Sequence, residues 1–262
     1  YGGKMSSKIR DLAQHEFFLT KLGFSSRRYS HLEVAAKILY IEECEIRQGK
    51  GAGFVDVKKR HLDKFVKDNK TISDSDMKKL MTAVERNLSW MQRIFDNTDS
   101  QLGKQSFPQL MYLFTKKLNR EYADPQIQLK IKGFLEAFTE ERVENQKKTE
   151  DERDPELSEY GRLTQQGTND GDSMRRRTGI LLRRFLKQNP EIALKDGKRL
   201  FDEDERIVIW QRASKKCEVC GNSIAIDEMQ ADHVLMHSHG GATTLENSRA
   251  LCVPCNTSKK HN

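Results

Sequence analysis

No stretch of this 262-residue chain approaches the roughly 20 consecutive apolar residues that a membrane-spanning helix needs. The sequence does not open with a secretory signal peptide, and we find no internal repeat. It begins Tyr-Gly-Gly-Lys-Met, which we interpret as the start of a fragment, a processed product or a tagged chain. With 36% hydrophobic and 32% charged residues, the length suits one large or two smaller domains and no membrane partner.

Cysteine is scarce but unevenly placed, with four of the five cysteines in two Cys-x-x-Cys pairs. Each pair supplies two thiolates from a tight turn, which predicts a tetrahedral structural Zn²⁺ site. Thiolate ligation rather than disulfide bonding suits a reducing cytoplasm, where we expect the protein to act. The fifth, Cys44, lies in an apolar helical stretch and is predicted to be a buried core residue. The four predicted zinc ligands are Cys217, Cys220, Cys252 and Cys255.

The 31 residues between the two pairs exceed the short insert of a plain zinc ribbon. Within and just after them lie Asp232-His233, Gly240-Gly241, Asn247 and Asn256. This arrangement resembles the HNH family of endonucleases, the ββα-metal fold, in a zinc-stapled form. Asn247 follows His233 by 14 residues and Asn256 follows it by 23, which are the offsets of that family.

Two departures from the family pattern concern detail. Asparagine in the last place makes the chain similar to the HNN variant. Met236 and His239 stand where the family often has Pro and Lys.

The resemblance implies a role for each residue in metal-dependent hydrolysis of DNA. His233 is the expected general base, because a neutral imidazole can accept a proton from water near pH 7. Asp232 and Asn256 offer hard oxygen ligands to one Mg²⁺ or Mn²⁺. Asn247 is expected to orient the histidine loop through its amide.

Simpler alternatives remain open for several of these residues. Asn247 is alternatively a turn residue, and Asn256 alternatively caps the final helix. Lys259 is a candidate phosphate contact or part of a solvated helix face. Three histidines near the site do not match the motif and are interpreted as solvent or substrate neighbours: His237, His239 and His261.

The net positive charge lies before the predicted HNH segment and not within it. Residues 201–262 hold 7 basic and 9 acidic residues, a formal net charge of −2, whereas residues 160–200 hold 10 and 4, a net charge of +6. A helix over 172–187 would gather apolar residues on one side and basic residues on the other, as a phosphate-binding surface would. Alternatives are a solvated face or pairing with acidic residues 150–158. The predicted nucleic-acid-binding residues are Arg176, Arg177, Arg183, Arg184 and Lys187.

The remainder is helical by apolar periodicity, so the predicted fold class is mainly α, with a small zinc-containing ββα-metal domain at the end. We expect a helical domain over 1–145, a charged linker and basic helix over 146–200, and the HNH domain over 201–262. The predicted helices cover 6–22, 31–47, 57–69, 74–96, 105–120 and 126–145.

The helical part also resembles, more weakly, the region between the ParB-like nucleotide-hydrolysing domain and the HNH domain of GmrSD-like restriction and anti-phage proteins. Two segments carry this resemblance, 12–33 and 160–168. The Gly-rich and acidic motifs of the nucleotide-hydrolysing domain are absent from the sequence given, so we expect no nucleotide hydrolysis by this chain.

Two classes of function follow from the sequence. The first is a metal-dependent DNA endonuclease that nicks, as the effector part of a bacterial restriction or anti-phage protein. The second is a zinc-stabilised nucleic-acid-binding or scaffolding module whose HNH site is inactive. A homo-oligomer or an upstream nucleotide-hydrolysing domain is a possible partner, alongside DNA.

Overall fold

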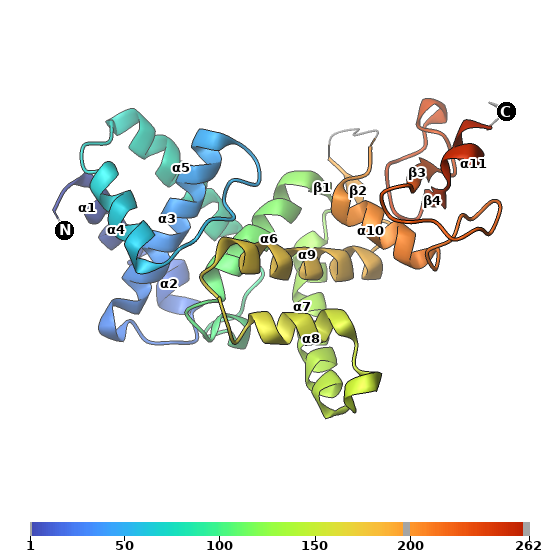
Figure 1. The fold of residues 1–262 in the computed structure, drawn as a ribbon. Coiled ribbons are helices and arrows are strands. Elements are labelled where there is room, and N and C mark those ends of the chain that lie inside the picture. The colour runs from blue at the N-terminus through green and yellow to red at the C-terminus, as the bar shows by residue number, and fades with distance from the viewer. Residues whose placement is uncertain (1, 196–199, 259–262) are drawn as a thin grey trace. The chain divides into compact units, whose positions relative to one another are not determined.

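The computed structural model describes residues 2–195 and 200–258, so the prediction for Lys259 lies outside the described residues. The chain is mainly helical with two short antiparallel sheets, which confirms the predicted fold class (Figure 1). It forms two compact units: an N-terminal unit of 1–117 and 128–178, and a C-terminal unit of 118–127 and 179–262. Within the described ranges, no helix combines the length and apolar character that crossing a bilayer requires.

The N-terminal unit is built from helices connected by short loops and three single turns of 3₁₀ helix. Helices α6 and α9 begin in this unit and end in the C-terminal unit. The helices are α1 (Lys4–Leu12), α2 (Glu16–Thr20), α3 (Ser30–Gln48), α4 (Lys59–Asp68), α5 (Asp74–Met91), α6 (Pro108–Glu121), α7 (Ile127–Lys147), α8 (Pro155–Leu163) and α9 (Gly171–Gln188).

Helix α3 is the central element of the N-terminal unit and contacts α1, α4 and α5. Most of its side chains are buried, including several polar ones, which is typical of a helix that is covered on several sides. Five of them have no or almost no exposed surface: Val34, Ala35, Ile38, Leu39 and Ile41. Cys44 on the same helix is 4% exposed, which confirms its predicted place in the core.

The sequence predicts one helix over 6–22, but the structure has two. Helix α1 ends at Leu12, and α2 begins after His15, whose Nδ1 accepts a hydrogen bond from the backbone N–H of Phe17 at 3.1 Å. This side chain caps the second helix, as a short polar residue usually does. The apolar periodicity continues across the break because Phe17 and Phe18 are both fully buried.

The predicted charged linker is wrong in its second half. Pro155 does not interrupt structure but occupies the first turn of α8, where its missing N–H needs no partner. Asp154 caps the same helix by accepting from the Leu157 N–H at 2.9 Å. Leu157, Tyr160 and Leu163 are buried, so this segment is part of the core of the N-terminal unit.

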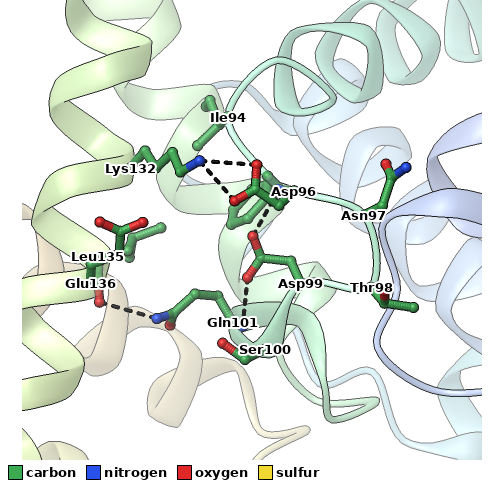
Figure 2. Close-up of a pocket in the computed structure, with 11 residues that line it drawn as sticks. Ile94, Asp96, Asn97, Thr98, Asp99, Ser100, Gln101, Lys132, Leu135 and Glu136 are labelled. Atoms are coloured by element: carbon green, nitrogen blue, oxygen red, sulfur yellow. Dashed lines mark hydrogen bonds and ion pairs between the residues drawn. The ribbon is translucent and has the colours of Figure 1, made fainter.

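A pocket of about 330 Å³ lies between the loop after α5 and helix α7, and its lining is rich in carboxylates (Figure 2). Two of its three carboxylates, Asp96 and Asp99, have internal partners. Asp96 is paired with Lys132 at 2.7 Å, and Asp99 accepts from the backbone N–H groups of Asp96 and Gln101. These contacts fix the loop, so no bound ligand is needed to account for Asp96 and Asp99.

The C-terminal unit combines segments that are far apart in the sequence. Strands β1 (Tyr122–Ala123) and β2 (Ala193–Leu194) form one antiparallel pair, and β3 (Gln230–His233) and β4 (Ser248–Leu251) form the other. Helices α10 (Glu203–Arg212) and α11 (Val253–Thr257) and the 3₁₀ turn η4 (His237–His239) complete it.

A buried glutamate connects the β1 segment to α10. Glu205 is 3% exposed, and its Oε1 accepts from the hydroxyl group of Tyr122 at 3.1 Å. Its Oε2 accepts from the backbone N–H of Asp202, while Asp202 accepts from the Glu205 N–H, forming a capping box. Burial, with Glu205 beside it, raises the pKa of Tyr122 well above its ordinary value, so the phenol stays a hydrogen-bond donor.

Two leucines of the N-terminal unit allow a matched test of its core. Leu39 is fully buried on α3, whereas Leu129 on α7 is 70% exposed. We expect Leu39→Ala to lower the free energy of unfolding by about 2–5 kcal/mol, because it removes buried methyl groups and leaves a cavity. Leu129→Ala should change it by less than about 0.5 kcal/mol. Urea unfolding followed by circular dichroism measures both, and equal effects would show that α3 is not the core helix.

Candidate catalytic site and four-cysteine cluster

The candidate site is built on a two-stranded hairpin followed by a short helix. Strand β3 ends at His233, a loop over 234–247 leads to β4, and α11 follows directly. The register pairs Asp232 with Arg249 and His233 with Ser248. Because neighbouring residues of a strand point to opposite faces, Asp232 and His233 lie on different sides of the hairpin.

Helix α10 holds the irregular loops of this unit through side chains that donate to backbone carbonyls. The Arg206 guanidinium donates to the Met229 carbonyl at 2.7 Å, and the Trp210 indole N–H donates to the Ile224 carbonyl at 2.8 Å. Arg212 donates to the carbonyls of Leu245 and Ser248 and to the Ser248 hydroxyl. Loop carbonyls that lack a strand partner thereby gain one.

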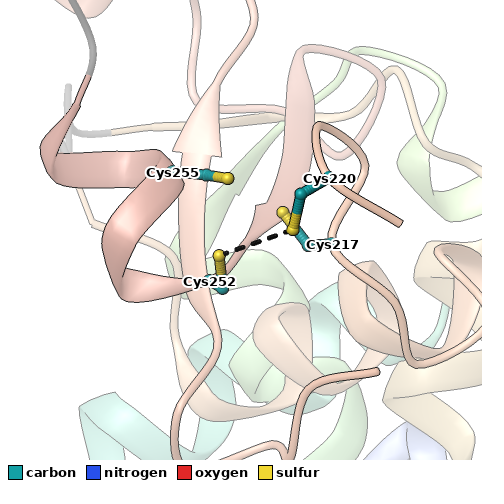
Figure 3. Close-up of side chains that lie close together, drawn as sticks. All are labelled: Cys217, Cys220, Cys252 and Cys255. Atoms are coloured by element: carbon teal, nitrogen blue, oxygen red, sulfur yellow. Dashed lines mark hydrogen bonds between the residues drawn. The ribbon is translucent and has the colours of Figure 1, made fainter. Parts of the chain in front are cut away.

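The four cysteines of the two pairs meet at one point (Figure 3). Their sulfur atoms all lie within 4.8 Å of one another, and the sulfurs of Cys220 and Cys252 are 3.8 Å apart. Zn–S bonds of about 2.3 Å in a tetrahedron give S···S separations of about 3.8 Å, so the cluster fits Zn²⁺ in size and in donor type.

The pKa values of two cluster thiols are shifted in opposite directions. Burial opposes ionisation of Cys217, but backbone amides that donate to its sulfur lower its pKa to about 6. Hydrogen bonding with Cys252, together with burial, raises the pKa of the Cys255 thiol to about 12. Four adjacent thiolates repel one another, so full ionisation requires a divalent cation at their centre.

His233 is held in a closed environment. It is 8% exposed, and its Nε2 lies 2.9 Å from the hydroxyl oxygen of Thr243, which is also buried. The ring of Phe201 lies against the imidazole with centroids 4.9 Å apart, and the ring of His237 stands edge-on at 6.0 Å. These contacts fix both the plane of the ring and one of its two nitrogens.

Asp232 is paired with the residue opposite it on the neighbouring strand. Its Oδ2 accepts from Nε of Arg249 at 2.9 Å. Asn256 lies inside α11 and not at its start, since the N-cap position is Cys252, so the alternative that Asn256 caps this helix is wrong. No measured contact joins Asp232 and Asn256 within the described ranges, but α11 contacts β3, the strand that carries Asp232.

Asn247 closes the loop that follows His233. Its side-chain oxygen accepts from the Leu235 N–H at 2.8 Å, and its side-chain nitrogen donates to the carbonyls of Leu235 and Ala242 at 3.0 and 2.9 Å. A Cβ on Gly241 would lie 1.9 Å from the Leu235 carbonyl oxygen, so only glycine fits where the loop folds back. Asn247 is therefore more than a simple turn residue.

The remaining histidines near the site differ in position. His237 contacts the ring of His233, whereas His239 is exposed. His261 lies outside the described residues. Sequence reasoning did not single out Thr243, Phe201 or Arg249. Strand alternation could have found Arg249, because a hairpin closed between His233 and Asn247 places it beside Asp232.

The basic helix over 172–187 forms as α9, but one of its predicted DNA-binding residues is wrong. Arg177 has no exposed surface and donates to the backbone carbonyls of Thr168 and Ser173. On a helical wheel Arg177 lies toward the basic residues, but its aliphatic stem is buried and its guanidinium satisfies backbone carbonyls. Arg177 therefore fixes a loop of the N-terminal unit and cannot contact DNA.

The other basic residues of α9 are partly engaged within the protein. Arg176 pairs with Glu159 and Asp172, and Arg183 pairs with Asp204 at 3.2 Å. Arg184 is half-buried and Lys187 is exposed. Intramolecular pairing lowers the charge that this face can offer to a phosphate, so DNA binding by α9 stays a prediction.

Replacing a cluster cysteine should abolish zinc binding, whereas replacing Cys44, which lies outside the cluster, should not. We expect Cys217→Ser and Cys252→Ser to lose bound zinc and to unfold the C-terminal unit, because a small unit with irregular loops depends on metal ligation. Cys44→Ala removes a thiol that lies outside the cluster and should retain zinc. Metal analysis of the purified full chains and their near-ultraviolet circular dichroism decide the matter. A wild-type chain without about one zinc would contradict the assignment of the cluster.

Comparison with known families agrees with this geometry. A family model described as HNH endonuclease matches residues 217–262, which include all four cysteines, β3, β4 and α11. Neither curated protein sequences nor solved structures give a significant match to the chain. The C-terminal part of the chain is therefore a small HNH domain that carries a four-cysteine cluster suited to zinc.

Proposed function

We propose that the protein is a metal-dependent DNA endonuclease. The observation that carries the proposal is the clamped loop between β3 and β4, in which Asn247 holds both sides of the segment that follows His233. A scaffold retained only for zinc binding would not require this amide bridge. The match to the HNH endonuclease family supports the same conclusion.

The catalytic metal would be held by oxygen ligands rather than by sulfur. Asp232 and Asn256 offer a carboxylate and an amide oxygen, the donors that Mg²⁺ and Mn²⁺ prefer. The Asp232 carboxylate accepts from Arg249 through one oxygen, and a carboxylate has acceptor capacity for a further ligand. A divalent cation there would stabilise negative charge on the phosphate and on the leaving oxygen.

His233 is the proposed general base, and Thr243 is its positioning residue. When the Thr243 hydroxyl oxygen accepts from the Nε2–H, the lone pair lies on Nδ1, the nitrogen that can take a proton from water. Phe201 and His237 limit rotation of the ring. In the reaction one P–O bond forms from water as another breaks, the water proton passes to His233, and the leaving oxygen is protonated from solvent.

A second candidate is the zinc-stabilised binding or scaffolding module with an inactive site. The ion pair between Asp232 and Arg249 favours it, since a guanidinium next to a metal ligand competes with a cation. A role as the effector of a restriction or anti-phage protein extends the first proposal. It is supported only by the resemblance of 12–33 and 160–168 to GmrSD-like proteins.

His233 at the end of β3 and His239 in the loop that follows allow a controlled test of the base. His233→Ala should reduce metal-dependent cleavage of plasmid by at least about 100-fold, because general base catalysis contributes about that much. His239→Ala removes an exposed imidazole six residues away and should cleave at the wild-type rate. Cleavage is followed on gels with Mg²⁺ or Mn²⁺ and abolished by EDTA, and zinc content confirms that both variants are folded. Equal rates for wild type and His233→Ala would show that His233 is not the base.

The products distinguish one site acting alone from two acting together. The strands of a duplex run in opposite directions, so one docked site presents its geometry to one scissile phosphate at a time. We therefore expect supercoiled plasmid to become open circles before linear molecules appear. Linear product from the earliest time points, with no nicked intermediate, would instead require a two-fold dimer.

A further inference from the structure

Arg249 stands beside the proposed metal site without a role in the proposed reaction. It lies on β4 directly opposite Asp232, and the only hydrogen bond of its side chain within the described ranges runs from Nε to Oδ2 of Asp232. The side chains of Arg249 and Asp232 are 31% and 18% exposed. The guanidinium is therefore anchored at one nitrogen and accessible from solvent.

The bond to Asp232 uses only part of the hydrogen-bonding capacity of the Arg249 guanidinium. Arginine has five N–H donors in a planar fork, and the Nε bond to Asp232 uses one of them. In the part of the chain that the structure describes, no acceptor is bonded to either Nη group of Arg249. The carboxylate fixes the direction of the fork and so reduces the entropy lost when the Nη groups bind a further anion.

The other arginines of the C-terminal segment are already engaged. Arg206 and Arg212 donate to backbone carbonyls of the loops. Residues 201–262 carry a formal net charge of −2, so a phosphate receives no general attraction from this segment. A specific cation at the site is needed to hold the substrate, and Arg249 is placed to supply it.

We propose that Arg249 binds the phosphodiester that is cleaved, donating from its Nη groups to the non-bridging oxygens of that phosphate. This inference rests on the proposed function. If Asp232 also held a divalent cation, the carboxylate would bring the guanidinium and the cation to one side of the hairpin, and both could bind a phosphate between them. The Arg249 donors then stabilise the negative charge that increases as the P–O bonds are exchanged.

A purely structural role for Arg249 predicts different behaviour. If the guanidinium served only to neutralise or orient Asp232, its loss would change the Mg²⁺ concentration needed for activity and leave the rate at saturating Mg²⁺ intact. If Arg249 instead binds the phosphate, its loss should lower the cleavage rate at every Mg²⁺ concentration. The variants Arg249→Gln and Arg249→Lys separate the two roles, since lysine keeps the charge but not the fork.

The first measurement is single-turnover cleavage of a DNA duplex at saturating Mg²⁺. We expect Arg249→Gln to be about 100-fold slower than wild type, as for the loss of one donor to a developing oxyanion. Arg249→Lys should fall between the two. The control is Lys104→Gln, which removes one positive charge from an exposed position of the N-terminal unit and should cleave at the wild-type rate. A wild-type rate for Arg249→Gln at saturating Mg²⁺ would overturn the proposal.

The second measurement does not depend on turnover. DNA affinity is measured by fluorescence anisotropy at fixed Mg²⁺ and varied KCl, in the His233→Ala background. Adding Arg249→Gln should lower the slope of log affinity against log salt by about one, because one phosphate contact is lost. An unchanged slope would show that Arg249 does not contact DNA. A chain that never cleaves but loses this slope would refute the proposed endonuclease and leave Arg249 as a phosphate ligand. Zinc content of each variant confirms folding.

Discussion

Mutual repulsion of four thiolates is the constraint on which the C-terminal segment depends. The sulfurs lie within 4.8 Å of one another, and the two pairs come from a turn at Cys217 and from the start of α11. A divalent cation at their centre converts repulsion into the bond that closes the segment. Since α11 also carries Asn256, the structural cluster and the proposed catalytic site share one short helix. The position of Asn256, a proposed ligand of the catalytic metal, thereby depends on the cysteines that begin the same helix.

In this unit, side chains that donate hydrogen bonds satisfy backbone carbonyls that strand pairing would satisfy in a larger sheet. Strands β3 and β4 have four residues each, and long loops surround them. Arg206, Trp210 and Arg212 donate to loop carbonyls from α10, and Asn247 donates to two more. Each bond satisfies a polar group that has no strand partner. An arrangement of this kind tolerates changes in its exposed apolar residues better than changes in these donors.

The sequence predicted the clustering of the four cysteines, the HNH domain and most helices, because each rests on spacing within a short segment. Apolar periodicity located α3, α5 and α9, but it could not show the break before α2, which depends on a cap by His15. Arg177 was misplaced for a similar reason. On a helical wheel it belongs to the basic side, yet the loop at Thr168 surrounds it, and contacts between segments are not visible in periodicity. Thr243 and Phe201 were missed because their contact with His233 exists only after folding.

The β1–β2 pair has a consequence for transfer of the C-terminal HNH domain from one protein to another. Strand β1 and Tyr122 come from a segment more than 70 residues before β2 and Glu205 in the chain. A cut at residue 200 would keep the four cluster cysteines and every motif residue, yet it would leave Glu205 buried without its phenol partner and remove both strands of the first sheet. The compact C-terminal unit, 118–127 and 179–262, is thus larger than the segment 217–262 that matches the HNH family. Recombination at the motif boundary would transfer the chemistry without the packing that supports α10.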